Sequence, residues 1–477
     1  HDVLPGSSIK QVYEDTDEMY ARIFDAGSRV LEGCINRIAS SIKTECQSLV
    51  VFNPLSWEKN GLVEFVYPSD KGRIYLVGKD GKIFTCQRVS QKDNKYVAEV
   101  EKVSSKGYST FEIKEGIDSG NNNDSELVLT NTLLENKFFR ITVDKQGNFT
   151  SIFDKKANRE VLKPGERGNV IQAFEDQPRR DDNWNLDIFY SEKMWEINDV
   201  ESLEVIEKGP VRGILRLTKR FLNSRIMQDI IIYNSIPRID FKTVVDWKEK
   251  DIVVKVAFPV DINANKATYE IQYGHLERNT HWNTTWDIAK FEVCGHKWAD
   301  LSEDGYGVSL LNDCKYGYDI KDSQIRLTLL RCGTIPNPDA DKEIHEFTYS
   351  LYPHVSGWRE SNTLHEAYDL NVPFIGRVIG SLPGSLSMIK VDKKNVIVEV
   401  VKKAEDSDKT VIRVYEAYNR RDHVKIQLHK NIKRIVECNL MEKEAGENSD
   451  LQYQGNEFTF SIKPFEIKTF KVQWVKD

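Results

Sequence analysis

The sequence predicts a mainly β protein in which one N-terminal helix is followed by several antiparallel β-sandwich domains. Three observations lead to this fold class: apolar residues recur at the helical spacing over residues 8–45, they alternate with polar residues from about Leu49 onward, and Asn, Gly and Pro separate the alternating segments. Strands at this spacing, without helices between them, favour antiparallel sheets over βαβ units. The length of 477 residues leaves room for roughly three domains, each with its own core.

Residues 1–46 form the first predicted segment, a helix with a single apolar face. Ile9, Tyr20, Phe24 and Leu31 are among the residues that recur at the helical spacing. A helix of this length gains most of its stability from packing against neighbours, and the rest of the sequence offers almost no other helical segment. We therefore expect the helix either to lie along the β region or to be the remnant of a helical bundle whose other members are missing.

Three β regions follow this helix. Residues 47–117 predict a small β-sandwich, residues 126–390 a large β-supersandwich, and residues 391–477 a C-terminal β-sandwich. Between the first two regions lies the segment 118–125, which is polar throughout and is the clearest linker in the sequence.

The composition argues against several classes of partner. The formal net charge is −7, from 67 basic and 74 acidic residues, and no basic stripe stands out, so nucleic acid is not an expected partner. No apolar run approaches the roughly 20 residues that a membrane span requires, so we expect no membrane partner. The seven cysteines are scattered and form no Cys-x-x-Cys pair. We therefore expect reduced thiols and a cytoplasmic protein.

The sequence opens on His1-Asp2 with no methionine ahead of it, which suggests the back half of a larger enzyme. A neutral imidazole is a good ligand for zinc or cobalt, and a neighbouring carboxylate can orient a substrate hydroxyl. Two alternatives stay open. The dipeptide can be a flexible terminus without a role, or the α-amino group and imidazole of His1 can chelate a copper ion, which needs a second histidine and an oxidising setting.

A second candidate site lies in the segment 181–190, where acids alternate with aromatic residues. Carboxylates such as Asp187 accept hydrogen bonds from sugar hydroxyls, and the faces of aromatic rings such as Trp184 pack on the C–H face of a sugar. The alternative is a polar loop at a strand edge whose aromatic residues belong to the core.

A third segment, residues 273–301, is dense in polar and aromatic side chains and is a candidate cleft wall. Its histidines lack helical ligand spacing, so a three-histidine metal site has little support, and its tryptophans are expected to cover a sandwich face. The residues concerned are His275, His281 and His296, and Trp282, Trp286 and Trp298. Acids that could form a catalytic pair are Asp187, Asp287, Asp300 and Asp313, although no spacing brings two of them together.

Several segments together resemble the C-terminal half of α-mannosidases of glycoside hydrolase family 38. The first three are HDVLPGSSI at residues 1–9, VFNPLSW at 51–57 and NWNLDIFY at 183–190. The longest is YEIQYGHLERNTHWNTTWDIAKFEVCGHKWADLSEDGYGVSLLNDCKYGY at 269–318, and HEFTYSLYPH follows at 345–354. The resemblance covers essentially the whole chain, and Leu-Pro-Gly-Ser-Ser at 4–8 places it nearest the cytosolic and bacterial branch.

This resemblance implies a retaining, metal-dependent enzyme that hydrolyses terminal α-linked mannose from oligosaccharides. In the family a catalytic (β/α) barrel precedes a helical bundle and several β-sandwiches, the largest of which is galactose-mutarotase-like. His1 matches the last metal ligand, with zinc the expected ion and cobalt the alternative, and Asp2 matches the adjacent acid that reaches the sugar. Trp184 and Asp187 are carried over as walls of the substrate pocket.

The barrel is absent from this sequence, so the resemblance leaves the catalytic residues, including the nucleophile, in an N-terminal half. That half and a mannose-containing oligosaccharide are the expected partners, a homo-oligomer is compatible with the sequence, and the chain alone is expected to be inactive. The rival hypothesis is a non-catalytic carbohydrate-binding β-sandwich protein, which predicts glycan binding by this chain alone.

Overall fold

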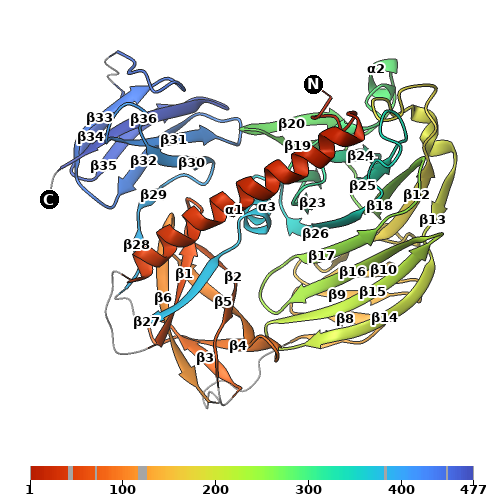
Figure 1. Cartoon of the computed structure of the whole chain (residues 1–477), viewed down its shortest axis with the longest axis horizontal. Coiled ribbons are helices and arrows are strands. Elements are labelled where there is room, and N and C mark those ends of the chain that lie inside the picture. The colour runs from red at the N-terminus through yellow and green to blue at the C-terminus, as the bar shows by residue number, and fades with distance from the viewer. Residues whose placement is uncertain are drawn as a thin grey trace. The chain divides into compact units, whose positions relative to one another are not determined.

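The computed structural model describes residues 2–40, 47–69, 72–116, 126–380, 384–446 and 450–475, without the side chains of residues 39, 40 and 380. Within these ranges the predicted fold class is confirmed: one long N-terminal helix precedes strands that pair in antiparallel sheets (Figure 1). The contacts divide the chain into two compact units. Unit 1 comprises residues 1–38, 122–270 and 277–371, and unit 2 comprises residues 39–121, 271–276 and 372–477.

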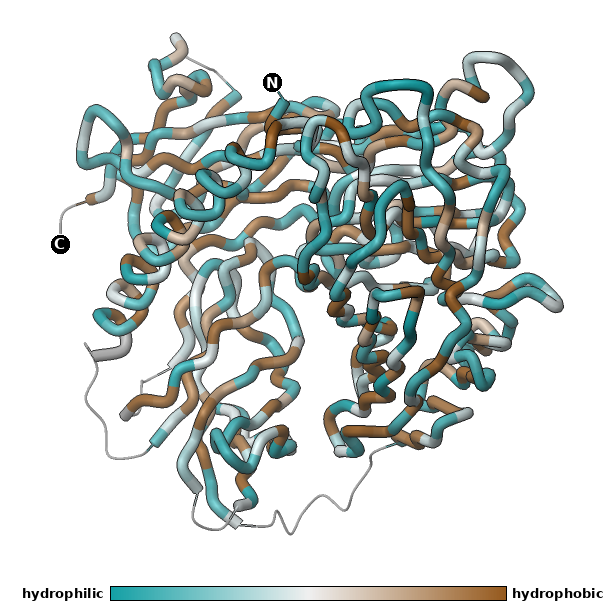
Figure 2. Tube along the Cα trace, turned by 45° about the vertical axis from the view of Figure 1, so that its right-hand side comes forward, coloured by the Kyte–Doolittle hydropathy of each residue, from teal (hydrophilic) through white to brown (hydrophobic). Residues whose placement is uncertain are grey.

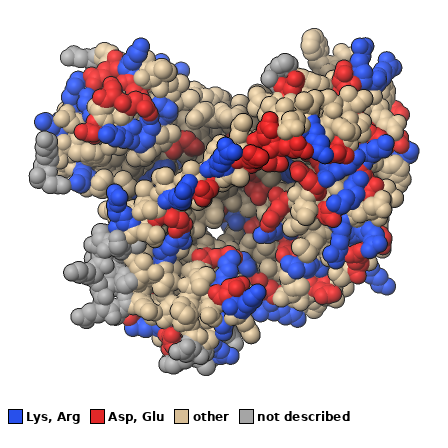
Figure 3. All heavy atoms as spheres, in the orientation of Figure 1, with Lys and Arg blue, Asp and Glu red and all other residues tan. Residues whose placement is uncertain are grey.

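The helix α1 (Lys10–Ser40) exposes most of its apolar side chains to solvent. Met19, Tyr20, Ile23, Phe24 and Val30 are all more than half exposed. Figure 2 shows hydrophobic and hydrophilic residues interleaved along this helix, and Figure 3 shows acidic side chains gathered over its first half. In the part of the chain that is described, no helix has the length and hydrophobicity needed to cross a membrane.

Unit 1 contains three antiparallel sheets among its described residues, although residues 271–276 at one edge of the nine-stranded sheet are grouped with unit 2. The nine-stranded sheet has, in spatial order, β14 (Asp199–Lys208), β15 (Arg212–Phe221), β16 (Ser224–Tyr233), β17 (Ile239–Asp246), β26 (Ile344–Val355), β23 (Tyr306–Asn312), β22 (Trp298–Glu303), β19 (Lys266–Ile271) and β20 (Gly274–Asn279). The six-stranded sheet has β13 (Met194–Glu196), β12 (Val170–Glu175), β18 (Ile252–Pro259), β25 (Gln324–Cys332), β24 (Gly317–Lys321) and β21 (Val293–Cys294). The five-stranded sheet has β11 (Arg159–Glu160), β10 (Phe149–Asp154), β9 (Phe139–Val143), β8 (Leu133–Glu135) and β7 (Val128–Leu129).

One hydrophobic core joins the three sheets of unit 1. It receives alternate residues of each strand, such as Val254 and Phe258 of β18, Leu327 of β25 and Phe241 of β17. Successive side chains of a strand point to opposite faces, so the residues between these core positions form the outer faces of the two larger sheets. Two short helices lie in loops of this unit, the 3₁₀ helix η1 (Ile188–Glu192) and α3 (Thr363–Asn371), and α2 (Thr285–Ile288) is a single turn.

Unit 2 contains an eight-stranded sheet and two four-stranded sheets among its described residues. The first contains β2 (Lys59–Val66), β5 (Lys95–Val103), β4 (Ile83–Ser90), β3 (Ile74–Val77), β6 (Gly107–Glu115), β1 (Gln47–Asn53), β27 (Ile375–Gly380) and β28 (Leu386–Ser387). The other two are β29 (Ile389–Val391), β32 (Asp422–Leu428), β35 (Glu457–Ile462), β34 (Gln452–Gln454), and β30 (Val396–Lys403), β31 (Thr410–Glu416), β36 (Ile467–Trp474), β33 (Ile432–Cys438). The buried side chains of the eight-stranded sheet form one hydrophobic core. The two four-stranded sheets share a second core.

Pairing in unit 2 joins segments far apart in sequence. Strand β27 pairs with β1, so that Gln47 lies opposite Gly380 and Phe52 opposite Ile375. Strand β28 pairs with β6 at Gly107, where a Cβ would collide with the carbonyl of Leu386. A glycine is therefore needed at residue 107 for this close approach of two strands.

Candidate functional site

The first residues of the chain form a tight turn that leads into α1. His1 lies outside the described residues. The backbone N–H of Ser7 donates to the carbonyl of Asp2 over 2.9 Å, and Gly6 adopts a φ of 74°, a conformation that favours glycine. Ser7 is buried beneath this turn, while Asp2 is partly exposed. The turn thus holds Asp2 close to the start of the helix.

An ion pair attaches the start of α1 to the loop between β25 and β26. Lys10 Nζ lies 3.0 Å from Asp339 Oδ2. The hydrogen bond from Lys10 holds the pKa of Asp339 below its ordinary value. Both side chains are more than half exposed, so this ion pair orients the two segments without adding much stability.

The same loop binds the segment 181–187. Asp182 accepts hydrogen bonds from the backbone N–H and hydroxyl of Thr334, over 2.6 and 2.8 Å, and from the N–H of Ile335 over 2.7 Å. Burial acts to raise the pKa of Asp182, but these donors outweigh it and the pKa lies below its ordinary value. The side chain of Asn183 fills the space that a Cβ on Gly333 would occupy. Residues 333–339 therefore contact both regions that the sequence singled out, the start of α1 and the 181–187 segment.

Trp184 and Asp187 both lie at the surface of this segment. Trp184 is 48% exposed, and its backbone N–H donates to the carbonyl of Asp181 over 2.7 Å. Asp187 precedes η1, is partly exposed, and accepts a hydrogen bond from the N–H of Arg179 over 3.2 Å. Phe189, one turn later, is 58% exposed. An indole ring, a carboxylate and a phenyl ring are thus presented within six residues, a composition that suits contact with a sugar.

A group of buried polar residues, here called the anchor cluster, holds η1 on the outer face of the six-stranded sheet. Its members are Lys255, Glu292, Asp319, Arg326 and Tyr190. Lys255 is fully buried and pairs with Glu292 and, over 3.6 Å, with Asp319. Arg326 lies 2.6 Å from Asp319, to which the hydroxyl of Tyr190 donates over 3.2 Å.

Burial raises the pKa of Glu292 even though Lys255 opposes it, and burial likewise raises that of Tyr190. The sequence analysis missed this cluster, whose one local signal is a lysine inside the apolar run of β18.

Each of the three histidines considered for a metal site has its own contacts in the described structure. His275 belongs to unit 2, where its ring lies 3.0 Å from the carbonyl of Ala417. His281 and His296 belong to unit 1, the first 3.8 Å from Asp287 and the second stacked edge-on to Tyr316. Within the ranges given above, one group of three potential ligands has its ligand atoms within 4.8 Å of one another, and it consists of Asp341, Glu343 and His345. His275, His281 and His296 are not in that group.

The three tryptophans of the segment 273–301 lie in different environments. Trp298 is buried and packs on Trp358 with ring centroids 4.8 Å apart, as expected for a residue that covers a sandwich face. Trp282 lies beneath Lys321, whose ammonium is 3.7 Å from the ring centroid. Trp286 on α2 is 80% exposed and therefore does not cover a sandwich face.

Three of the candidate acids are engaged in hydrogen bonds within the fold. Asp287 completes a capping box with Thr284 at the start of α2. Asp313 accepts hydrogen bonds from the N–H of Thr348 over 3.0 Å. Asp300 is buried against His354. These contacts give each acid a structural role and bring no two of them together.

The comparisons with known proteins agree with this architecture. A family model described as "Glycosyl hydrolases family 38 C-terminal domain" matches residues 134–339, and one described as "Glycosyl hydrolases family 38 C-terminal beta sandwich domain" matches residues 395–470. Alpha-mannosidase G of Dictyostelium discoideum is 33% identical over 99% of this chain and 46% of its own length. Alpha-mannosidase 2C1 of Homo sapiens is 31% identical over 98% of this chain and 44% of its own length. The chain thus spans less than half the length of these curated relatives.

Solved structures confirm the fold. The crystal structure of an alpha-mannosidase from Enterococcus faecalis V583 superposes with a TM-score of 0.81, over 98% of this chain and 61% of that chain, at 15% identity. The sequence resemblance, the two family models and this superposition agree with one another. The chain belongs to glycoside hydrolase family 38 and corresponds to the C-terminal domains of that family.

Proposed function

We propose that this chain is the C-terminal portion of a retaining α-mannosidase that removes terminal α-linked mannose from oligosaccharides. The observation that supports this most is the similarity to two proteins named as α-mannosidases over 98–99% of the chain. Retention requires two carboxyl groups that flank the scissile bond, one as nucleophile and one as acid and base. Asp287, Asp300 and Asp313 are engaged in hydrogen bonds within the fold, and the family resemblance implies a nucleophile on a barrel that this chain lacks, so the proposal assigns the nucleophile to an N-terminal catalytic half.

The exposed face of α1 supports the proposal of a protein partner. Full burial of an apolar side chain of the size of Ile23 or Phe24 contributes about 1.5–3 kcal/mol, and several such residues of α1 are exposed together. An exposed patch of this kind marks an interaction site. We assign the catalytic half to this face. A cytoplasmic location and a homo-oligomer remain predictions from the sequence.

The metal dependence is proposed from the chemistry of the first two residues. An imidazole at His1 suits zinc or cobalt, but a full set of ligands is not assembled in the described part of unit 1, where the one cluster of potential ligands is Asp341, Glu343 and His345. We propose, from the family resemblance, that the N-terminal half supplies the other ligands. When bound, a divalent ion acts as a Lewis acid toward the hydroxyls of the substrate.

The residues of this chain bind and orient the sugar in the proposed enzyme. Asp2, fixed by the turn to Ser7, accepts a hydrogen bond from a mannose hydroxyl. Trp184 places its ring against the C–H face of a sugar, and the carboxylate of Asp187 accepts from another hydroxyl. Asp182 and Lys10, which neighbour these residues in sequence, attach their segments to residues 333–339. A segment that is ordered before binding loses less entropy when the sugar binds.

The test is hydrolysis of an aryl α-mannoside by an enzyme that contains this chain together with its N-terminal half. We expect activity that chelation abolishes and that zinc or cobalt restores. Asp2→Asn should lower kcat/KM by about tenfold to a hundredfold, since it removes a charged hydrogen-bond acceptor from the substrate. Failure of the complete enzyme to cleave the mannoside with either metal supplied would overturn the proposal.

A further inference from the structure

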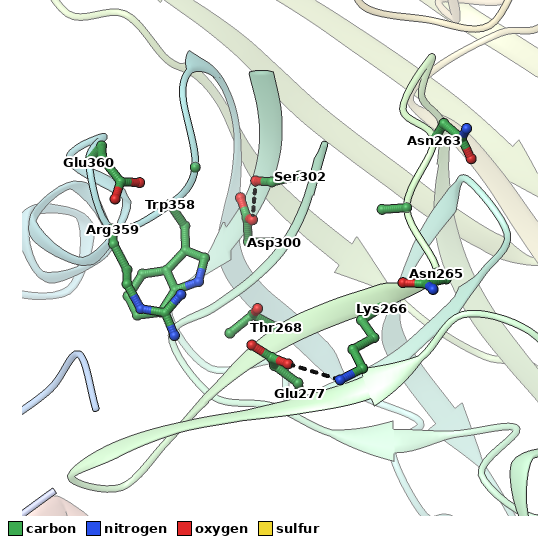
Figure 4. A pocket seen from close by; sticks show the side chains of 12 residues that line it. Asn263, Asn265, Lys266, Thr268, Glu277, Asp300, Ser302, Trp358, Arg359 and Glu360 are labelled. Atoms are coloured by element: carbon green, nitrogen blue, oxygen red, sulfur yellow. Dashed lines mark hydrogen bonds and ion pairs between the residues drawn. The ribbon is translucent and has the colours of Figure 1, made fainter. Parts of the chain in front are cut away.

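Unit 1 carries a polar pocket on the outer face of the nine-stranded sheet. Its volume is about 580 Å³, within the range of small-molecule sites. Lys266 and Glu277 of the β19–β20 hairpin form one side, Asp300 and Ser302 of β22 lie deeper, and the turn 357–360 after β26 closes the other side (Figure 4). The pocket shares no residue with the loops and helix start described above.

The alternation of β22 explains why polar groups line this pocket. In the segment WADLSE, Ala299 and Leu301 belong to the core, so Asp300 and Ser302 point to the outer face. Thr268 of β19 lies directly opposite Asp300, and Ser309 of β23 lies opposite it on the other side. Three neighbouring strands thus present hydroxyl and carboxylate groups on the same face.

The deepest part of the pocket is a hydrogen-bonded network around Asp300, which is 1% exposed. Its carboxylate accepts from the hydroxyls of Ser302 and Ser309, over 2.5 and 2.7 Å, and lies 2.8 Å from His354 Nε2. The other ring nitrogen of His354 lies 3.0 Å from the carbonyl of Ser356. Both ring nitrogens of His354 therefore contact oxygen atoms of the network. A Cβ at Gly307 would collide with Ser302 and His354, so glycine leaves room for this network.

The turn that closes the pocket is tied to the same network. Trp358 is buried against Trp298, and the guanidinium of Arg359 lies 4.4 Å from the centroid of the Trp358 ring. The hydroxyl of Ser361 donates to the carbonyl of Trp358 over 3.1 Å and lies 2.9 Å from the hydroxyl of Thr363. Thr363 in turn lies 2.8 Å from Ser309. These contacts hold the wall of the pocket in place before any ligand binds.

Three of the charged groups that line the pocket are held by partners. Lys266 pairs with Glu277 over 3.4 Å, and the carboxylate of Asp300 accepts from the hydroxyls of Ser302 and Ser309. Charges that are already engaged in this way give little advantage to an ion. The closely spaced donors and acceptors of the pocket instead match hydroxyl groups, which both donate and accept hydrogen bonds.

We propose that this pocket binds one or two pyranose rings of a neutral oligosaccharide that carries α-mannose. The chemistry of the pocket requires a neutral, polyhydroxylated ligand, while the choice of mannose rests on the proposed function. This site would allow the chain to hold an oligosaccharide by itself, without residues from another polypeptide.

The test is calorimetric titration of this chain alone with a linear α-mannotriose. Asn265 is an exposed residue at the rim of the pocket, and Asn265→Trp should block entry without disturbing the core. Asn131→Trp makes the same substitution at an exposed asparagine outside the pocket and is the matched control. We expect saturable binding that Asn265→Trp weakens by about tenfold or more, a loss of about 1.4 kcal/mol, and that Asn131→Trp leaves unchanged, with equal melting temperatures.

Three results would overturn the proposal: no binding of mannotriose to the unsubstituted chain, equal binding by the Asn265→Trp variant, or displacement of mannotriose by inorganic phosphate. Hydrolysis of an aryl α-mannoside by the complete enzyme is measured separately. Hydrolysis without binding to this chain refutes the pocket alone, whereas binding to this chain without hydrolysis by the complete enzyme refutes the proposed function alone.

Discussion

The two large sheets of unit 1 share one core, yet their outer faces are used differently. On the six-stranded sheet, η1 and the segment 181–187 are held by the anchor cluster and present Trp184, Asp187 and Phe189 to solvent. On the nine-stranded sheet, a second buried cluster holds α3, and the turn 357–360 that precedes α3 closes a pocket. In both places buried charges fix a segment over a sheet.

The second cluster consists of Arg238, Asp240, Glu366, Tyr233 and Ser350. Arg238 lies 2.9 Å from Asp240 and 3.0 Å from Glu366 of α3. The hydroxyls of Tyr233 and Ser350 both donate to Asp240 over 2.5 Å. Buried charges therefore position a segment on the outer face of each sheet. Whether a ligand can be enclosed there depends on the neighbouring parts of the chain. The nine-stranded face encloses a pocket within this chain, whereas we propose that a partner completes the six-stranded face.

Removal of the buried lysine of the anchor cluster should have the largest effect. In a Lys255→Met variant, the carboxylates of Glu292 and Asp319 lose a buried partner, which typically costs about 3–5 kcal/mol of unfolding free energy. Urea denaturation measures this loss. Limited proteolysis should also show faster cleavage within residues 181–192, because η1 loses its support.

The matched control is Lys242→Met on β17. Lys242 pairs with Glu346 over 3.1 Å, but both side chains are more than half exposed. Such a pair contributes at most about 1 kcal/mol. If Lys255→Met were no more destabilising than Lys242→Met, the anchor cluster would not be what holds η1.

The second cluster predicts a specific dependence of stability on pH. Burial raises the pKa of Glu366 from 4.5 to about 7, although Arg238 opposes this shift. Between these values the folded protein binds a proton that the unfolded chain does not, so the contribution of Glu366 is fully present below pH 4.5 and is lost as the pH rises through about 7. In a Glu366→Gln variant, the free energy of unfolding should fall by about 3 kcal/mol less over this pH range.

Urea denaturation at several pH values between 4.5 and 8 measures that difference. Glu346→Gln, an exposed acid on β26, serves as the control and should give a curve parallel to that of the unsubstituted chain. A Glu366→Gln curve that is also parallel would show that burial does not favour the protonated form of this acid.

A substitution on the exposed face of α1 tests whether a partner binds there, as proposed for the region around the six-stranded sheet. Phe24 is 68% exposed and stacks with Tyr20, ring centroids 6.0 Å apart. Phe24→Ser should weaken association with the catalytic half by about 1.5–3 kcal/mol and leave the stability of this chain nearly unchanged. Arg29→Ser, at an exposed residue that pairs with Asp25, is the control. Equal affinities of the two variants, measured by calorimetry, would exclude this face as the contact surface.

The smallest expected effect is that of Trp184. Trp184→Ala in the complete enzyme should lower kcat/KM by roughly tenfold, about 1.4 kcal/mol, because the sugar loses an aromatic surface. Tyr453→Ala removes an aromatic ring of similar exposure from β34 of unit 2 and should leave kcat/KM unchanged. Equal kinetics of the two variants would remove Trp184 from the sugar-binding surface.

Local periodicity was sufficient to predict the helix and the strands. The helical spacing predicted for residues 8–45 agrees with α1 over Lys10–Ser40, and residues 41–45 lie outside the described residues. Alternation predicted β regions that contain strands such as β16, whose core residues include Ile226 and Ile230. The apolar face of α1 was also predicted, and most of its side chains are exposed to solvent. That the helix is the remnant of a bundle stays a prediction.

Features that depend on pairing across the chain were not predicted. Lys255 and Glu292 are separated by 37 residues, and Asp300 and His354 by 54, so no local pattern marks either pair. The pairing of β27 with β1 joins segments more distant still. The link between the start of α1 and the 181–187 segment runs through residues 333–339, which had no chemical signal of their own.

The most direct test of the central claim is complementation. The N-terminal catalytic half and this chain are assayed for hydrolysis of an aryl α-mannoside, each alone and then mixed at increasing ratio with zinc or cobalt present. The expected result is no hydrolysis by this chain alone and a rate that rises to a plateau at equal amounts of the two polypeptides. A mixture that associates but does not hydrolyse the mannoside, or equal hydrolysis by this chain alone, would contradict the account.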